Sequence, residues 1–308
     1  MTDRSTEEQY LGQVLCGDCI SEMDKLPADA ARLVIADPPY FQVLTGEKWD
    51  QQWESQTHYL DWTLKWMLSA MRLLVPGGLL YCFGQPGKRE HVMLQLMSEA
   101  TRLWHFHDLI IWDRVVGYNR RSDSFTPAYE MILVLRKAGA DAYFDRDAVR
   151  EPYDEATIAL YAKDKRYKNP VKRMAYLQQG KELTNLWRVP SLKGASKEKS
   201  GHPAQKPCAL IERIIRSNSK PGEWVVDPFL GSGTTAVVAQ RCGRTWTGIE
   251  SSEHYAAIAR QRIEKGKRLS GTPEMPTAAT RCPKCADAPS HNEHQDSQTC
   301  TCGVTNCG

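Results

Sequence analysis

One short stretch combines an acid, two prolines and an aromatic residue, and these residue types at this spacing can bind an amino group. The four residues are Asp37-Pro38-Pro39-Tyr40, and they follow the apolar run 33–36. A short apolar run that ends at breakers is typical of a buried strand in a parallel sheet. Neither proline carries an N–H, so the Asp37 carboxylate and the nearby carbonyls face outward as acceptors with few local donors. Such a turn suits a substrate with an NH2 group, although a rigid turn without chemistry fits the four residues equally well.

A second candidate site is a glycine-bearing turn late in the chain. The pattern predicts a strand over 224–227, the turn 228–233, a helix over 234–241 and a strand over 245–250. Glycines let the backbone approach a ligand at the strand ends, and a carboxylate about 20 residues further on can bind ribose hydroxyls. Glu250 holds that position. The turn has neither the spacing Gly-x-Gly-x-x-Gly nor the Lys-Ser/Thr pair of a P-loop, so a phosphate cradle is the weaker interpretation.

The segment 163–199 concentrates the positive charge. It contains eleven Lys or Arg residues and three acids, a local balance of +8, whereas the whole chain of 308 residues has a net charge of +3. Tyr161, Tyr167, Tyr176 and Trp187 are interleaved with these charges. Basic residues with aromatics suit phosphate contact and base stacking, which predicts a nucleic-acid partner; a solvated charged face is the simpler alternative.

Half of the ten cysteines lie in the last 27 residues. Cys282-Pro-Lys-Cys285 has the spacing of a zinc knuckle, and tetrahedral zinc needs four ligands. The predicted set is therefore Cys282, Cys285, Cys300 and Cys302, with Cys307 as an alternative. Because the second half is Cys-x-Cys, a disordered tail without metal remains the other interpretation.

The motifs and their order resemble the β group of amino DNA methyltransferases, which modify the N6 amine of adenine or the N4 amine of cytosine. Asp37-Pro38-Pro39-Tyr40 resembles the catalytic motif of that group, His202-Pro203-Ala204-Gln205-Lys206-Pro207 the segment before its cofactor strand, and Phe229-x-Gly231-x-Gly233 its cofactor loop. The likeness covers roughly residues 14–268, in the order catalytic, recognition, cofactor.

The resemblance implies a role for each matching residue. Asp37 and a proline-flanked carbonyl accept the two hydrogens of the target amine, while Tyr40 stacks on a base swung out of the helix. Asp18 contacts the adenine of S-adenosylmethionine, although a helix N-cap explains this acid equally well. Lys206 lies near the carboxylate end of that cofactor. The expected cofactor-binding set is Asp18, Lys206, Asp227, Phe229, Gly231, Gly233, Thr234 and Glu250.

The same resemblance implies a doubly wound α/β fold, with a mostly parallel seven-stranded sheet and an inserted target-recognition subdomain. The catalytic half is expected over 1–137, the insertion over 138–200 and the cofactor half over 201–270, followed by a linker over 271–280 and the Cys-rich tail over 281–308. The DNA contacts expected in the insertion are Lys165, Arg166, Lys168, Lys172 and Arg173.

The function implied is site-specific methylation of adenine N6 in double-stranded DNA, with S-adenosylmethionine as methyl donor. Cytosine N4 is the alternative, while an RNA methyltransferase and a non-catalytic nucleic-acid-binding protein rank lower. Cytosine-C5 chemistry is disfavoured because the only Pro-Cys pair, Pro207-Cys208, lies in the cofactor-side hexapeptide. A homodimer and a cognate restriction endonuclease are left open. No apolar stretch is long enough to span a bilayer, so we expect no membrane partner and a cytoplasmic protein of bacterial, phage or plasmid origin.

Overall fold

The computed structural model describes residues 8–44, 46–86, 91–118, 120, 122–164 and 166–269. Met1–Arg268 form one compact unit, and Leu269–Gly308 form a second. The predicted zinc ligands, the linker and Lys165 lie outside the described residues, so their roles stay predictions. Within the described ranges, no cluster of His, Cys, Asp and Glu side chains could hold a metal ion. None of the helices described is both long and apolar enough to cross a bilayer.

In the described residues, eight strands form one sheet in the order β1-β8-β7-β2-β3-β5-β4-β6. The strands are β1 (Gln13–Cys16), β2 (Ala31–Ala36), β3 (Leu74–Gly84), β4 (His105–Asp113), β5 (Tyr129–Arg136), β6 (Leu186–Arg188), β7 (Trp224–Asp227) and β8 (Thr245–Glu250). Only β5 runs antiparallel to its neighbours β3 and β4. The predicted mostly parallel sheet is confirmed, with the short edge strand β6 as an eighth strand.

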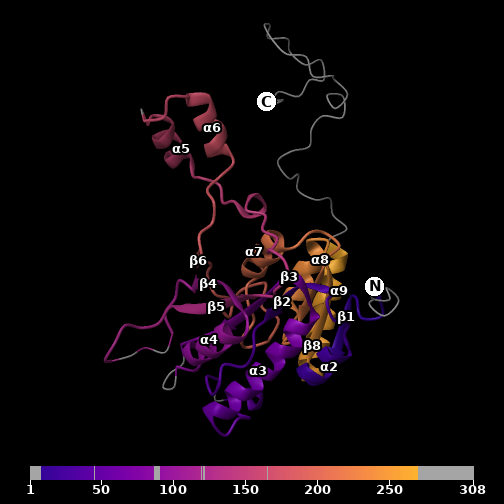
Figure 1. Cartoon of the computed structure of the whole chain (residues 1–308). Helices are drawn as coiled ribbons and strands as arrows, with labels where there is room; N and C mark the ends of the chain where they lie inside the picture. The colour runs from indigo at the N-terminus through magenta and orange to yellow at the C-terminus, as the bar shows by residue number, and fades with distance from the viewer. Residues whose placement is uncertain are drawn as a thin grey trace. The chain divides into compact units, whose positions relative to one another are not determined.

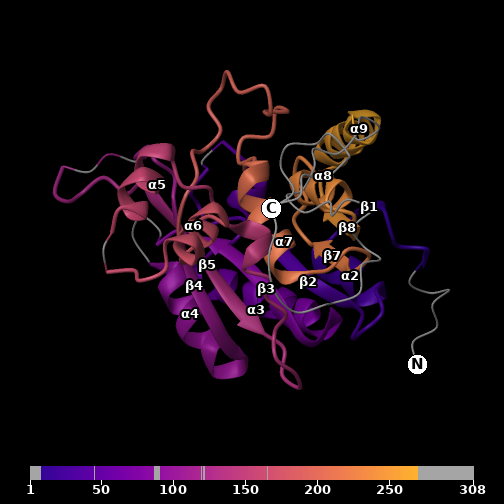
Figure 2. The ribbon, with the colours of Figure 1, turned by 90° about the horizontal axis from the view of Figure 1, so that it is seen from above.

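Helices cover both faces of this sheet (Figures 1 and 2). They are α2 (Cys19–Lys25), α3 (Gln56–Leu73), α4 (Val92–Leu103), α5 (Glu155–Ala162), α6 (Pro170–Gln178), α7 (Cys208–Asn218), α8 (Thr234–Arg241) and α9 (Glu253–Leu269), with short 3-10 turns η1 (Lys48–Asp50) and η2 (Asp147–Val149). Side chains alternate along β2, so Val34 and Ala36 pack with α2, α3 and α4, while Leu33 and Ile35 pack with α7, α8 and α9. The predicted doubly wound architecture is therefore observed.

The junction between α3 and β3 places a proline and two glycines inside a strand. Helix α3 ends at Leu73 and β3 begins at Leu74, so Pro76-Gly77-Gly78 lie within β3. The pairing with β2 shifts register between Ala31 and Leu33, and the proline and glycines lie within this irregularity. Gly77 has a φ of 78°, and a Cβ there would overlap the Asp141 carbonyl. The glycines therefore permit a bulge inside a strand.

The predicted insertion contains α5 and α6, which pack on each other and lie above the sheet in Figure 1. Two chain segments join this helix pair to the sheet. They are tied together where Glu151 and Lys181 exchange backbone hydrogen bonds of 3.1 and 2.8 Å. The Glu151 carboxylate also accepts from Arg213 of α7 at 2.5 Å. This contact is one of several that anchor the segment 138–200, because η2 also packs on α7 and β6 pairs with β4. The exact boundaries of the insertion stay a prediction.

Candidate active site

A cavity of about 440 Å³ lies where several strands end. Its lining includes Asp18 after β1, residues 37–40 after β2, Asp227 at the end of β7 and Glu250 at the end of β8. Neighbouring β2 and β7 lead into helices on opposite faces of the sheet. Ligands of doubly wound folds bind at such a reversal, beyond the carboxyl ends of the strands. The topology thus brings both sequence motifs to one cavity.

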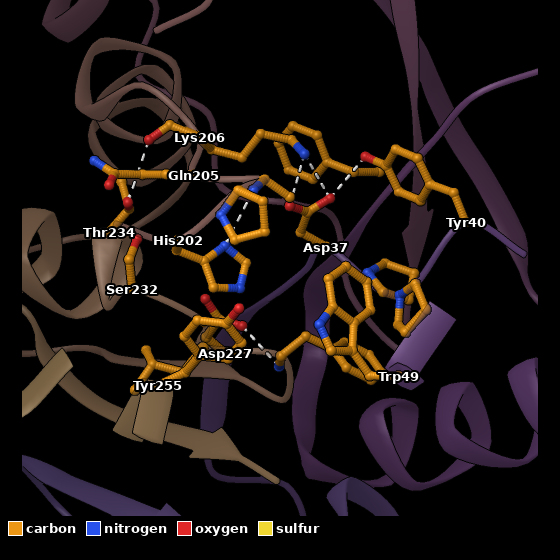
Figure 3. Close-up of a pocket in the computed structure, with 18 of the residues that line it drawn as sticks. Asp37, Tyr40, Trp49, His202, Gln205, Lys206, Asp227, Ser232, Thr234 and Tyr255 are labelled. Atoms are coloured by element: carbon orange, nitrogen blue, oxygen red, sulfur yellow. Dashed lines mark hydrogen bonds and ion pairs between the residues drawn. The ribbon is translucent and has the colours of Figure 1, made fainter. Parts of the chain in front are cut away.

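Asp37 is held by a cation and a hydroxyl. The Lys206 Nζ donates to both carboxylate oxygens of Asp37, at 2.7 and 2.6 Å, and the Tyr40 hydroxyl donates to Oδ1 at 2.6 Å. Figure 3 shows Lys206 and Tyr40 reaching Asp37 from opposite sides. In this structure Lys206 contacts the proposed catalytic acid and lines the cavity, and its predicted position near the carboxylate end of the cofactor stays a prediction.

Glu130 is a second carboxylate of this site, and the sequence analysis missed it. It lies at the start of β5, is 3% exposed, and its Oε2 is 2.9 Å from the Tyr40 hydroxyl and 3.4 Å from Lys206 Nζ. Arg114 contacts its other oxygen at 3.0 Å. The sequence did contain a signal for this residue, since Glu130 is the one acid in the apolar segment 129–136. A charge in a buried strand requires charged or polar partners, which points to a site.

The titration of the two groups around Asp37 follows from these contacts. Burial opposes the charged ammonium of Lys206, but Asp37 and Glu130 outweigh it, so the pKa of Lys206 is raised. Burial and the same two carboxylates raise the pKa of Tyr40 well above its usual range. Lys206 therefore stays a cation and Tyr40 a neutral donor at physiological pH.

The chain after the catalytic motif is fixed by a buried carboxylate. Phe41 and Gln42 adopt successive left-handed conformations, with φ of 60° and 57°. This turn directs backbone N–H groups towards Asp50, whose Oδ2 accepts from Leu44 N at 2.6 Å. Burial raises the pKa of Asp50, while these amides lower it. The Tyr59 hydroxyl also binds the Pro39 carbonyl at 2.6 Å, so the motif sits in a rigid frame.

The glycine turn and Glu250 form the other end of the cavity. Glu250 accepts from Gly231 N at 2.8 Å and from Ser252 N at 2.9 Å. Burial raises the pKa of Glu250. Burial also raises the pKa of Asp227 to about 7, although Asp227 accepts from Phe229 N at 2.9 Å. The acids predicted to bind the cofactor thus also hold the loop that approaches it.

The remaining predicted cofactor residues have structural roles as well. Asp18 caps α2 by accepting from Ser21 N at 3.0 Å, which confirms the N-cap interpretation. Asp18 also lines the cavity, and its contact with the cofactor stays a prediction. Gly233 precedes α8 with a φ of 81°. Thr234 Oγ1 donates to the Lys206 carbonyl at 3.2 Å. The ring of Phe229 packs edge-on against two tryptophans, Trp62 and Trp66.

A group of three aromatic rings that contact one another also lines the cavity. His202 packs between Tyr255, at 4.4 Å between ring centroids, and Trp49, at 6.2 Å. Its Nδ1 accepts from Ala204 N at 3.2 Å. Burial, followed by the charge of Lys206, lowers the pKa of His202 to about 4. The imidazole is therefore neutral at physiological pH and closes the cavity beside Gly231 (Figure 3).

None of the predicted DNA-contacting residues that the structure describes lines the cavity. Arg166 pairs with Asp164 at 2.6 Å. The Arg173 guanidinium lies over three tyrosine rings, at 3.9, 5.4 and 5.7 Å from their centroids, so it packs the helix pair together. Lys168 and Lys172 are exposed and make no ion pair with another described residue. Among the members of the predicted set that the structure describes, these two lysines are therefore the exposed cations without an ion-pair partner.

Comparison with known proteins identifies the class. Residues 31–261 match the family model for N6 and N4 methyltransferases, described as DNA methylase. This match spans well over half of the 308 residues. The chain therefore belongs to this family of DNA methylases, as the resemblance of its motifs implied.

Two curated relatives agree with this assignment. Type II methyltransferase M1.MboII from Moraxella bovis is 30% identical over 243 residues, which cover 77% of this chain and 91% of that protein. DNA adenine methyltransferase YhdJ from Escherichia coli K12 is 30% identical over 260 residues, which cover 83% and 84%.

Solved structures show the same fold. PvuII DNA methyltransferase, named cytosine-N4-specific, gives a TM-score of 0.60 at 19% identity and covers 84% of this chain and 91% of its own. TTHA0409 from Thermus thermophilus, complexed with S-adenosyl-L-methionine, gives 0.54 at 25% identity and covers 82% and 95%.

We predict that His202 makes the protein sensitive to acid. The unfolded chain binds a proton on this imidazole near its ordinary pKa of 6.5, whereas the folded protein binds it only near pH 4. Stability should therefore fall as the pH is lowered from about 6.5 to about 4, by up to roughly 3 kcal/mol from this group. Urea unfolding of wild type and His202→Gln at pH 7.5, 6.5, 5.5 and 4.5 measures the difference.

The exposed His58 on α3 offers a matched control, His58→Gln. The pH-dependent loss should be smaller in His202→Gln than in both wild type and this control. Equal slopes in the three proteins would contradict the burial assigned to the His202 imidazole.

Proposed function

We propose that the protein transfers a methyl group from S-adenosylmethionine to the N6 amine of adenine at specific sites in double-stranded DNA. The observation that carries this proposal is the position of Asp37, whose carboxylate lies in the same cavity as the glycine turn and Glu250. The name of the adenine methyltransferase YhdJ supports the base, and the cofactor complex of TTHA0409 supports the methyl donor. A cytoplasmic location, a homodimer and a cognate restriction endonuclease stay predictions.

The chain's own residues fit the methyl donor. Gly231 has a φ of 52°, and a Cβ there would reach within 3.3 Å of the His202 ring, so a side chain at this position would be strained and would press on the cavity wall. Glu250 uses two acceptor positions for backbone amides, and a carboxylate has about four, which leaves acceptors for ribose hydroxyls. When bound, the cofactor supplies an electrophilic methyl group: the S–C bond breaks, a C–N bond forms, sulfur becomes a neutral thioether and the amine releases one proton.

Asp37 and the adjoining backbone would activate the amine. The lone pair of an exocyclic amine is delocalised into its ring, so acceptors placed for the pyramidal nitrogen favour the transition state over the ground state. Tyr59 occupies the Pro39 carbonyl, whereas no hydrogen bond from another described residue reaches the Pro38 carbonyl, which makes the latter the second acceptor beside Asp37. The base must leave the helix to reach these groups.

The first experiment incubates the purified protein with labelled S-adenosylmethionine and mixed-sequence duplex DNA, followed by nucleoside mass spectrometry. N6-methyladenine is the expected product. In Asp37→Ala the methyl transfer should fall by about a thousandfold or more, because the main acceptor for the amine is lost, while cofactor affinity stays within a few-fold.

N4-methylcytosine as the product would keep the mechanism and correct the base, since the same acceptors serve either amine. A parallel loss of cofactor affinity and methyl transfer in Asp37→Ala would contradict the role given to this acid.

We predict that Gly231→Ala weakens cofactor binding. The substitution places a methyl group at the cavity wall and forces alanine into a left-handed conformation, which costs about 1–2 kcal/mol. Gly222→Ala is the matched control, because Gly222 has a φ of 83° and open space around it, outside the cavity lining.

Both variants should lose similar stability in urea unfolding. Isothermal titration with S-adenosylmethionine should show about tenfold weaker binding for Gly231→Ala alone. Equal affinities in the two variants would exclude the glycine turn from the cofactor site.

We predict that Lys172 contributes to DNA affinity through phosphate contact. Lys172→Glu should reduce the slope of log affinity against log salt by about one or more, because each neutralised phosphate releases a counterion. Lys65→Glu, at an exposed position on α3, is the control of equal charge change. Fluorescence anisotropy with a labelled duplex at several salt concentrations measures both slopes; an unchanged slope in Lys172→Glu would place the DNA elsewhere.

A further inference from the structure

A buried carboxylate, Glu130, and a half-buried one, Asp37, share one lysine in the cavity. Lys206 is 9% exposed, and its ammonium binds Asp37 at 2.6 and 2.7 Å while Glu130 lies 3.4 Å away on the other side. The Tyr40 hydroxyl is also within reach of both acids, at 2.6 Å from Asp37 and 2.9 Å from Glu130. A hydroxyl carries one proton, so it can donate fully to only one of them at a time.

The contacts of Asp37 conflict with its proposed task. A carboxylate offers about four acceptor positions, and the lysine and the tyrosine together occupy three of those on Asp37. An incoming amine therefore competes with a cation for the same oxygens. One acceptor position remains free, but a carboxylate that holds an ammonium is a weaker acceptor, so the amine is held more strongly once Lys206 releases Asp37.

Glu130 lies close enough to accept the hydrogen bonds of the Lys206 ammonium and the Tyr40 hydroxyl when these groups leave Asp37. A buried ammonium needs a carboxylate partner at every stage, because an unpaired buried charge is strongly unfavourable. Glu130 is itself fixed, since Arg114 contacts its Oε1 at 3.0 Å and Gln85 donates to the same oxygen at 3.5 Å. The four charged groups, two acids and two bases, balance whichever acid holds the lysine.

We propose that Glu130 is a positioning residue for methyl transfer, which takes over the Lys206 ammonium and the Tyr40 hydroxyl when the target amine binds Asp37. This proposal rests on the proposed function and deepens it. Lys206 remains protonated throughout, so the exchange moves hydrogen bonds and no proton. Glu130 thereby frees the acceptors of Asp37 without touching the substrate.

The test is a double-mutant cycle on kcat/KM for DNA methylation, with Glu130→Gln, Lys206→Met and the double variant. Glu130→Gln keeps the shape but removes the charge, so Lys206 stays on Asp37 and kcat/KM should fall by about tenfold or more, while the affinity for S-adenosylmethionine stays within about threefold. In the Lys206→Met background no ammonium needs a second partner. The double variant should therefore be at least as active as Lys206→Met alone.

A purely structural role for Glu130 predicts an equal loss in both backgrounds, and a double variant less active than Lys206→Met would overturn the proposal. The control is Glu212→Gln, which removes ion pairs to Arg216 and Arg241 at 2.8 and 2.5 Å, away from the cavity, and should keep kcat/KM within about twofold.

Urea unfolding of every variant shows whether each one folds. If Glu130→Gln does not fold, the comparison of the charge-balanced double variant with Lys206→Met still decides the outcome. A wild-type protein that methylates DNA at cytosine instead of adenine would correct the proposed function alone, and the cycle would be measured on that product. Absence of any methyl transfer by wild type would remove both proposals.

Discussion

The contact between Lys206 and Asp37 joins two parts of the chain that lie 169 residues apart in sequence. One residue follows β2 and the other precedes α7, so the pair can form only after the parallel sheet has placed β2 beside β7. Burial makes the contact selective, because an ammonium that is 9% exposed cannot exchange its carboxylate partners for water. The charged group and its two acids thus add a second link, beyond the pairing of β2 with β7, between the catalytic motif and the segment before α7.

The doubly wound topology explains why the order of the motifs along the chain does not limit the chemistry. Strands β1, β2, β7 and β8 end at the same edge of the sheet, so residues from the first 40 positions and from positions beyond 200 line one cavity. The glycine turn and Glu250 bring the backbone close at one end, while Asp37 and Tyr40 stand at the other. Because both motifs follow strands that end at this common edge, the catalytic motif can come before or after the glycine turn along the chain.

Much of the fold could be predicted from the sequence because apolar periodicity is a local signal. In the sequence of α7, Leu210, Ile211, Ile214 and Ile215 recur at helical spacing, and all four are buried. The proline and glycines at 76–78 are an ambiguous signal, because they break a helix and also permit a bulge within a strand. The helix α4 was missed although Val92, Met93, Leu96 and Ala100 form a buried face.

The site was less predictable, because the partners of a charged side chain depend on tertiary structure. The acid of the motif was predicted, whereas its contact with Lys206 and the presence of Glu130 beside both were not. Arg173 was predicted to contact DNA, and the structure shows its guanidinium packed over three tyrosine rings, while the DNA contact stays a prediction. A sequence shows that charge and aromatics alternate, whereas only the folded chain shows whether the aromatic rings face a ligand or the arginine itself.

The bridge between Glu151 and Lys181 has an evolutionary consequence. It closes the base of the segment that carries α5 and α6, so the two chain ends leave the core side by side whatever lies between them. The entropy of closing a loop grows only slowly with its length, and each doubling costs about 0.6 kcal/mol. Recombination that replaces residues 152–180 would therefore leave the sheet and its cavity intact, so the same core can accept a different segment at this place.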